Sequence, residues 1–177
     1  MSLTVILGGA RSGKSGMAQR LARATGRPVV FLATATAGDD EMAARIERHR
    51  RERPTDWVVI EEPVDLSGTL ERIDGEDTVI IDCVTLWLSN VLGIGWSEPT
   101  ILAGAAETAQ RAGTRPGETI VVSNEVGMGV VPVTPLGRSF RDLAGRVNRT
   151  WVDAADRAGL VVAGRVLPLL MPLKWDE

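Results

Sequence analysis

The sequence contains little of several residue types, and each scarcity excludes a class of structure. Cys83 is the only cysteine among 177 residues, so the chain cannot form an internal disulfide. No group of cysteines and histidines has the spacing of a zinc site. No apolar stretch approaches the roughly 18 residues that a membrane-spanning helix requires, and the N-terminus lacks the pattern of a secretory signal. We therefore expect a cytoplasmic protein without a membrane span.

Charge and rare side chains narrow the choice of partners. The formal net charge is −3, which does not favour binding to nucleic acid or to an anionic membrane. Lys14 and Lys174 are the only lysines among 20 basic residues, His49 is the only histidine, and tyrosine is absent. A rare residue in a chemically sensible place is therefore informative.

Short apolar segments alternate with segments of helical periodicity along the chain. Strands are predicted at residues 3–7, 29–33, 57–60, 78–81, 119–123, 160–163 and 166–170. Helices are predicted from 12 or 13 to about 25, from about 40 to 51, and over 65–73, 84–92, 99–112 and 136–158. This alternation predicts an α/β fold with a mostly parallel central sheet and helices on both faces.

A glycine-rich segment between the first predicted strand and the first predicted helix matches the phosphate-binding pattern G-x-x-x-x-G-K-[ST]. Its residues are Gly8, Gly9, Ala10, Arg11, Ser12, Gly13, Lys14 and Ser15. The glycines let backbone N–H groups turn toward a phosphate, and the following helix directs its positive end at the same anion. We expect Lys14 to contact the β- and γ-phosphates of a nucleoside triphosphate and the Ser15 hydroxyl to bind Mg²⁺. The predicted architecture is a single P-loop NTPase-like (RecA-like) domain over residues 1–177.

A second ligand for the metal is expected at the end of a neighbouring strand. Residues 78–81 are apolar or β-branched and are followed directly by Asp82. An acidic residue in this place holds Mg²⁺ in P-loop enzymes, so we favour that role for Asp82. Asp82 also precedes a predicted helix, where aspartate is a common N-cap, and the two roles are compatible.

His49 lies in a predicted helix that is rich in arginine. Five arginines and two glutamates stand between Arg45 and Arg53, and the spacing of Met42, Ile46 and His49 places them on one helical face. Neighbouring cations disfavour protonation of an imidazole, so a neutral ring nitrogen would be available to attack phosphorus. The arginines are suited to binding phosphate oxygens. A solvated basic surface explains the same residues, and the sequence leaves both interpretations open.

The order of several segments resembles one enzyme family. The segments are the loop 8–15, the run Asp40-Glu41-Met42-Ala43-Ala44-Arg45-Ile46 leading to His49, Arg53-Pro54 with Trp57, the run Ser123-Asn124-Glu125-Val126-Gly127-Met128-Gly129-Val130-Val131-Pro132, and the run Phe140-Arg141-Asp142-Leu143-Ala144-Gly145-Arg146-Val147-Asn148. They are similar to segments of the bifunctional adenosylcobinamide kinase/adenosylcobinamide-phosphate guanylyltransferases of cobalamin (vitamin B12) biosynthesis. The resemblance extends from residue 3 to about residue 162.

This resemblance implies two reactions. ATP or GTP would phosphorylate the aminopropanol hydroxyl of adenosylcobinamide. GTP would then donate GMP, through a guanylylated His49, to that phosphate, giving adenosylcobinamide-GDP and pyrophosphate. His49 and Lys14 are thus the expected catalytic residues, and the family is associated with a homotrimer.

The resemblance also extends the nucleotide site beyond the loop and Asp82. The additional residues are Ala33, Thr34, Ala35, Arg50, Arg51, Glu52, Arg53 and Glu61. Asn124 and Glu125 would contact nucleotide or corrinoid, or would form an ordinary turn with a solvated acid, and the sequence does not decide between these interpretations.

Two other functions are compatible with the motifs. A monofunctional P-loop kinase of a small molecule would need the loop but not His49. A GTP-binding switch without group transfer is disfavoured because the chain has no Asn-Lys-x-Asp sequence to recognise guanine. GTP, ATP and Mg²⁺ are the expected cofactors of the bifunctional enzyme, and adenosylcobinamide and its phosphate are its expected small-molecule partners.

Overall fold

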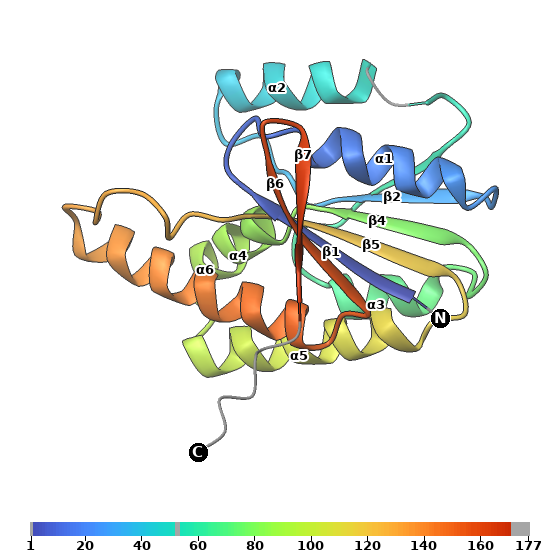
Figure 1. Ribbon diagram of the computed structural model, residues 1–177. Helices are drawn as coiled ribbons and strands as arrows, with labels where there is room; N and C mark the ends of the chain where they lie inside the picture. Colours follow the sequence, from blue (N-terminus) through green and yellow to red (C-terminus); the bar gives the residue numbers. More distant parts are fainter. Residues whose placement is uncertain (1, 52–53, 171–177) are drawn as a thin grey trace.

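A seven-stranded sheet forms the centre of the computed structural model, which describes residues 2–51 and 54–170 apart from the side chains of Glu41, Arg45 and His49 (Figure 1). The strands are β1 (Ser2–Gly8), β2 (Val29–Ala33), β3 (Val58–Glu61), β4 (Thr78–Asp82), β5 (Glu118–Asn124), β6 (Arg157–Val162) and β7 (Arg165–Leu169). Their order is β3-β2-β4-β5-β1-β6-β7, and all neighbours are parallel except β6 and β7. The prediction of a mostly parallel sheet is confirmed.

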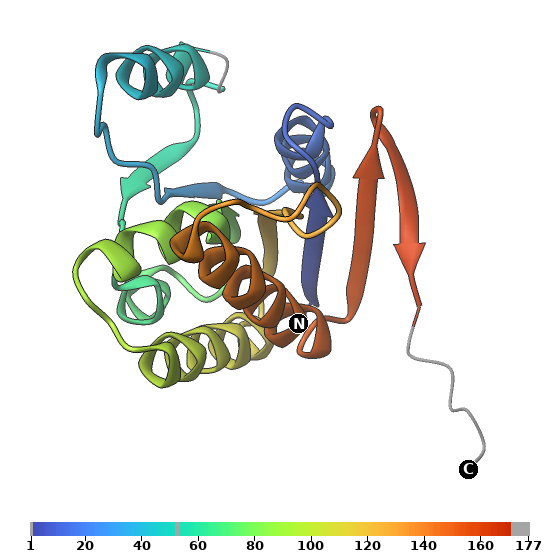
Figure 2. The same cartoon turned by 90° about the vertical axis from the view of Figure 1, so that its left-hand side faces the viewer.

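Helices lie on both faces of this sheet (Figure 2). One face carries α1 (Lys14–Ala24), and α2 (Asp40–Arg51) stands farther from the sheet on the same side. The other face is covered by α3 (Leu66–Arg72), α4 (Val84–Gly93), α5 (Glu98–Thr114) and α6 (Pro135–Asp153). No helix in the described part of the chain is long and apolar enough to cross a membrane.

Helices cover both faces of the central strands, so the side chains of these strands are apolar on both faces. Leu3, Val5 and Leu7 belong to the core on the side of α3 to α6, whereas Ile6 packs with Ala18 on the side of α1. Successive side chains of a strand point to opposite faces, so one continuous apolar run supplies both halves of the core. These runs gave the clearest strand predictions.

The prediction of one helix over 136–158 is wrong at its C-terminal end, because α6 stops at Asp153 and β6 begins at Arg157. The Leu3 N–H donates to a carboxylate oxygen of Asp156 at 2.8 Å, and the Asp156 N–H donates to the Leu3 carbonyl at 3.0 Å. These two bonds attach the chain to the start of β1. Pairing with β1 therefore overrides the helical spacing of the apolar residues that follow Asp153.

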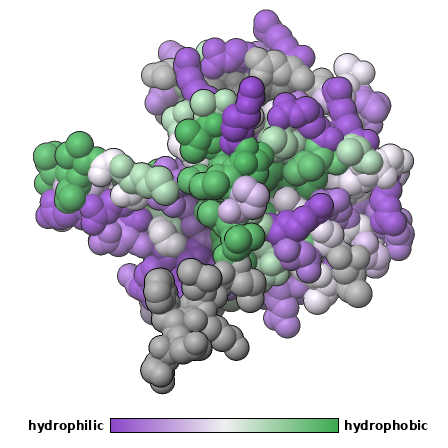
Figure 3. Space-filling model, in the orientation of Figure 1, coloured by the Kyte–Doolittle hydropathy of each residue, from purple (hydrophilic) through white to green (hydrophobic). Residues whose placement is uncertain are grey.

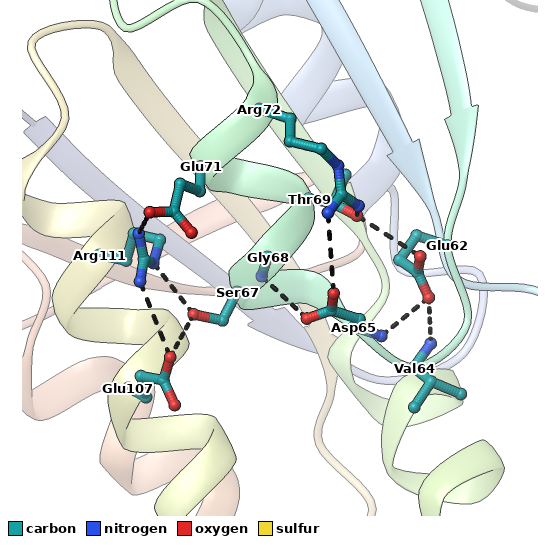
Figure 4. A network of polar contacts seen from close by, with 10 residues as sticks. All are labelled: Glu62, Val64, Asp65, Ser67, Gly68, Thr69, Glu71, Arg72, Glu107 and Arg111. Atoms are coloured by element: carbon teal, nitrogen blue, oxygen red, sulfur yellow. Dashed lines mark hydrogen bonds and ion pairs between the residues drawn. The ribbon is translucent and has the colours of Figure 1, made fainter.

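A polar network fixes α3 against α5 on the side of the sheet away from α1 (Figure 4). The Asp65 carboxylate caps α3 by accepting the Gly68 N–H at 2.8 Å. Ser67 of α3 donates to Glu107 of α5 at 2.7 Å and accepts from Arg111 at 3.0 Å. The network thus joins two helices by side chains that remain partly exposed.

Candidate active site

The register of the parallel strands brings four strand ends to one edge of the sheet. Gly8 of β1 pairs with Asn124 of β5, and Ala33 of β2 pairs with Asp82 of β4. A cleft of about 820 Å³ lies at this edge. Its walls come from the glycine-rich loop, the start of α1, the strand ends, α2 and the start of α4. Open α/β sheets bind ligands at the carboxyl ends of their strands, so this cleft is the candidate site.

The glycine-rich loop has a backbone shape that requires glycine at its two ends. Gly13 has φ +102°, and a Cβ added to Gly8 would lie 2.5 Å from the carbonyl oxygen of Val161. Lys14 starts α1, is 6% exposed, and its Nζ donates to the Gly9 carbonyl at 2.6 Å. The loop therefore connects β1 to α1 as predicted, with its lysine in the cleft wall.

The turn between β6 and β7 contacts the same loop. The Gly164 N–H donates to the Ser12 carbonyl oxygen at 2.8 Å, and a Cβ added to Gly13 would lie 3.3 Å from the Cα of Gly164. Both turn residues have positive φ, +48° at Ala163 and +74° at Gly164. The Ser12 hydroxyl is buried and has no hydrogen-bond partner among the described residues. Ser12 lines the cleft, and an unsatisfied buried hydroxyl there fits a bound phosphate oxygen.

Ser15 and Asp82 both line the cleft, and their side-chain oxygens could hold a metal ion. No group of three or more acidic, cysteine or histidine side chains suited to a metal occurs among the described residues. This small donor set fits Mg²⁺, which usually keeps several waters and binds to proteins through one or two side chains together with substrate phosphates. The alternative N-cap role of Asp82 is wrong, since Cys83 occupies the N-cap position of α4 and Asp82 ends β4.

Cys83 is a neutral thiol at the base of this wall. Burial raises its pKa to about 12, and the negative charge of Asp82 acts in the same direction. The positive charge of Lys14 lowers the pKa by less. Cys83 is therefore not suited to act as a thiolate nucleophile at neutral pH.

Helix α2 forms the opposite wall of the cleft. Its N-terminus is capped by Asp39, whose carboxylate accepts the Met42 N–H at 2.7 Å. The cleft-lining residues of α2 are Met42, Ala44, Ile46 and Arg48. His49 follows Ile46 by three positions in the helix, and its side chain lies outside the described part of the structure.

The far end of α2 is joined to the end of β3 by an ion pair between Arg50 and Glu61. The hydrogen bond to Glu61, and then the charge of that carboxylate, raise the pKa of Arg50 above its ordinary value. None of the described side chains of α2 is buried. The helix is therefore held at the cleft by few contacts.

Most of the predicted nucleotide-site residues gather at this cleft. Those that line it are Arg11, Ser12, Gly13, Lys14, Ser15, Ala33, Ala35, Glu61 and Asp82. Gly8 is the buried end of β1, Gly9 and Ala10 form the exposed start of the loop, and Arg50 reaches the cleft through Glu61.

The other four predicted residues lie away from the cleft lining or outside the described residues. The Thr34 side chain is fully buried, where it donates to the Cys83 carbonyl and accepts the Cys83 N–H, both at 2.8 Å. Arg51 is exposed and pairs with Glu47 of its own helix at 3.0 Å. Glu52 and Arg53 lie outside the described residues.

Sequence reasoning missed several residues of the wall. They are Gly16, Gln19, Cys83, Leu86 and Val122. Asn124, for which contact with a ligand and an ordinary turn were both open, also lines the cleft. Gln19 follows Ser15 by one helical turn, and Val122 precedes Asn124 by two strand positions, so periodicity would have found these two. Periodicity gives no comparable signal for Cys83 or Leu86.

The sequence is similar to known proteins over most of its length. The sequence profile of a family described as cobinamide kinase / cobinamide phosphate guanyltransferase matches residues 4–169. The bifunctional adenosylcobalamin biosynthesis protein CobP of Pseudomonas aeruginosa is 44% identical over 167 residues, which cover 93% of this chain and 95% of the relative. The corresponding protein CobU of Escherichia coli is 38% identical over 175 residues, which cover 92% and 96%.

Solved structures of low sequence similarity share the fold. The RadB recombinase has a TM-score of 0.51 at 15% identity, over 90% of this chain and 73% of its own. An ATPase of a bacterial type III secretion system has a TM-score of 0.51 at 14% identity, over 90% of this chain and 51% of its own. These neighbours confirm the RecA-like P-loop fold.

Proposed function

This chain belongs to the cobinamide kinase / cobinamide phosphate guanyltransferase family, and we propose that both reactions of the family take place in the cleft at the carboxyl edge of the sheet. The chain is a bifunctional enzyme of cobalamin biosynthesis, with adenosylcobinamide and its phosphate as substrates. One observation supports the shared site above all. The phosphate-binding loop and α2, the helix that contains His49, are opposite walls of one cleft.

In the kinase reaction, the loop binds the phosphates of ATP or GTP. Backbone N–H groups of residues 8–15 and the Lys14 ammonium hold the β- and γ-phosphates, while the start of α1 adds its positive dipole. The aminopropanol hydroxyl of adenosylcobinamide attacks the γ-phosphorus, a new O–P bond forms, and the bond to the β-phosphate oxygen breaks, while the hydroxyl proton passes to a phosphate oxygen and then to solvent. Ser15 and Asp82 would hold Mg²⁺, which neutralises phosphate charge when bound.

In the guanylyl transfer, a ring nitrogen of His49 attacks the α-phosphorus of GTP. An N–P bond forms and pyrophosphate leaves; a phosphate oxygen of adenosylcobinamide phosphate then attacks the same phosphorus and frees the imidazole. Met42 and Ile46 line the cleft, and His49 is the next residue in their helical row. Arg48 also lines the cleft, where its charge would stabilise the leaving pyrophosphate.

Labelling with GTP that is radioactive at its α-phosphate tests the histidine step. We expect an acid-labile, base-stable label on the protein that is absent in His49→Ala and unchanged in Arg149→Ala, an exposed site on α6. Added adenosylcobinamide phosphate should discharge the label into adenosylcobinamide-GDP. Active wild-type enzyme that never takes up label would contradict this step and support a monofunctional kinase.

A second assay follows the γ-phosphate from ATP or GTP to adenosylcobinamide. We expect His49→Ala to retain this transfer and Lys14→Ala to lose both activities, because both reactions use the same phosphate cradle. Slow hydrolysis without transfer to any small molecule would instead revive the nucleotide-dependent switch.

We also propose that the chain is one catalytic domain that assembles as a cytoplasmic homotrimer. Figure 3 shows apolar side chains at the projecting end of α6 and over the β6–β7 hairpin. The exposed apolar residues are Met128, Val130, Val131, Val133 and Leu136 near α6, and Val162, Val166, Leu167 and Leu170 on the hairpin. Monomeric proteins rarely expose apolar patches of this kind. Light scattering coupled to gel filtration should give three times the chain mass, and a monomeric mass at micromolar concentration would contradict the proposal.

A further inference from the structure

Asn124 is the last residue of β5, and its side chain lines the cleft. The side chain of the preceding residue, Ser123, lies on the opposite face of the sheet. Val122 and Asn124 line the cleft, whereas Ser123 is buried and bonded to α4 and α6. This follows from strand alternation, which sends successive side chains to opposite faces. Side chains on the face of the sheet away from the cleft can therefore contact the backbone of Asn124.

A closed ring of hydrogen bonds surrounds the peptide groups of Asn124 on that face. The Asn124 N–H donates to Thr85 Oγ1 at 2.7 Å, and the Asn124 carbonyl accepts from Asn148 Nδ2 at 3.0 Å. Ser123 Oγ donates to Asn148 Oδ1 at 2.7 Å and lies 3.0 Å from Thr85 Oγ1.

The directions of these bonds are determined by the number of protons available. Ser123 has one hydroxyl proton, and the carboxamide oxygen of Asn148 can only accept it. The proton between the two hydroxyls must therefore come from Thr85, whose oxygen accepts the Asn124 N–H. Thr85, Ser123 and Asn148 are at most 7% exposed, and each of their polar side-chain atoms has a hydrogen-bond partner in the ring. A fully satisfied buried network is rigid.

The ring fixes the place of the Asn124 carboxamide in the cleft. Strand β5 lies between β1, which leads to the phosphate-binding loop, and β4, which ends at Asp82. The next residue is also held, because the Glu125 N–H donates to the Gly8 carbonyl at 3.0 Å. The Asn124 amide nitrogen lies 4.0 Å from Cys83 Sγ, next to Asp82. The carboxamide thus lines the cleft between the phosphate-binding loop and Asp82, the proposed Mg²⁺ ligand.

We infer that Asn124 is a catalytic residue that contacts the γ-phosphoryl group, and that Thr85, Ser123 and Asn148 are positioning residues that hold it there. The inference rests on the proposed function of the cleft. A carboxamide can donate to a phosphate oxygen and accept from an incoming hydroxyl without adding charge. Donors that are fixed before the reaction stabilise developing charge without reorganisation. The kinase reaction should therefore depend on the ring more than the attack on the α-phosphorus does.

Turnover of γ-phosphate transfer to adenosylcobinamide tests this inference. We expect Asn124→Ala to lower kcat by roughly 10²-fold, as for loss of an oriented donor. Thr85→Val keeps the shape but removes the hydroxyl, and should lower kcat by about tenfold through misplacement of Asn124. The KM for the nucleotide should change by less than about threefold, because the loop contacts are unaltered. Thr85→Ser, which keeps the hydroxyl, should recover most of the lost rate.

A double-mutant cycle separates positioning from a general structural role. In the Asn124→Ala background, Thr85→Val should have no further effect on kcat, because the group that it positions is gone. Thr108→Val, a buried threonine of α5 whose hydroxyl donates to Gly104, is the control and should leave kcat unchanged. Equal loss of kcat from Thr85→Val in both backgrounds would overturn the positioning role.

Two results distinguish failure of this inference from failure of the proposed function. If Lys14→Ala abolishes transfer while Asn124→Ala is fully active, the cleft is the site and Asn124 is not catalytic. If Lys14→Ala retains transfer, the cleft is not the kinase site and both proposals fail. Thermal melts of each variant identify any loss of rate that comes from unfolding, and Asn124, at the cleft surface, is the variant least prone to it.

Discussion

The contact between the β6–β7 turn and the phosphate-binding loop predicts that a substitution near the C-terminal end of the fold weakens nucleotide binding. Gly164 has φ +74°, no atom lies within 4 Å of a Cβ added there, and its N–H donates to Ser12. Gly164→Ala therefore introduces backbone strain without a direct clash. Strain of this kind costs about 1–2 kcal/mol for an alanine.

The strain can be relieved by a shift of the turn that breaks the bond to Ser12. Loss of one such hydrogen bond costs about 0.5–1.5 kcal/mol. If the loop is then less often in its binding conformation, nucleotide affinity should fall by roughly two- to tenfold. A domain of this size loses about 2–4 °C of melting temperature per kcal/mol, so the variant should also melt a few degrees lower.

Gly26 provides the matched control for this experiment. It has φ +68°, no atom lies within 4 Å of an added Cβ, and it follows the end of α1 that is remote from the loop. Gly26→Ala should therefore lose similar stability and keep wild-type affinity. Titration of a fluorescent GTP analogue, with melting curves of both variants, measures the two effects. Equal affinities of Gly164→Ala and Gly26→Ala would refute the reasoning.

Two further predictions concern the core and the cleft wall. Folding raises the pKa of Cys83 from 9.0 to about 12, so the neutral thiol is favoured in the folded state. This contribution to stability is present below pH 9 and is lost as the pH rises toward 12. At pH 8 a thiol reagent should label Cys83 readily only after denaturation, and rapid labelling of the folded protein would contradict the burial. Leu32→Ala, at a fully buried site of β2, should lower the free energy of unfolding by about 2–5 kcal/mol in urea titration, whereas Val59→Ala, on the exposed edge strand β3, should have an effect within about 0.5 kcal/mol.

Local patterns predicted the parts of the molecule that depend on neighbours in sequence. The apolar runs ending at Gly8, Ala33 and Asp82 identified three strands and their order along the chain. The pattern of glycines and Lys14 located the phosphate loop, because its shape is determined within eight residues.

The remaining features depend on contacts between segments far apart in sequence. The hydrogen bond from Gly164 to Ser12 joins two residues that are far apart in the sequence, so no local pattern encodes it. The family resemblance implies that Thr34 lines the nucleotide site, but the pairing of β2 with β4 places its hydroxyl against the peptide of Cys83. The end of α6 was misplaced for the same reason, since pairing with β1 determines it.

Helix α2 has few contacts with the rest of the protein, so we expect the two reactions to differ in how strongly they depend on its stability. None of its described side chains is buried, so much of its stability comes from local interactions such as the cap by Asp39. Asp39→Ala removes an N-cap worth about 1 kcal/mol and should increase local opening of α2.

In the proposed mechanism, the guanylyl transfer requires His49 on α2, whereas γ-phosphate transfer uses residues of the sheet edge and the loop. We therefore expect Asp39→Ala to lower the rate of protein labelling by GTP by up to about fivefold and to leave γ-phosphate transfer nearly unchanged. Asp65→Ala removes an equivalent cap from α3 on the opposite side of the sheet, and both activities should persist in it. If Asp39→Ala lowers both activities equally, α2 also supports the kinase site, and the division of labour between helix and sheet edge is wrong.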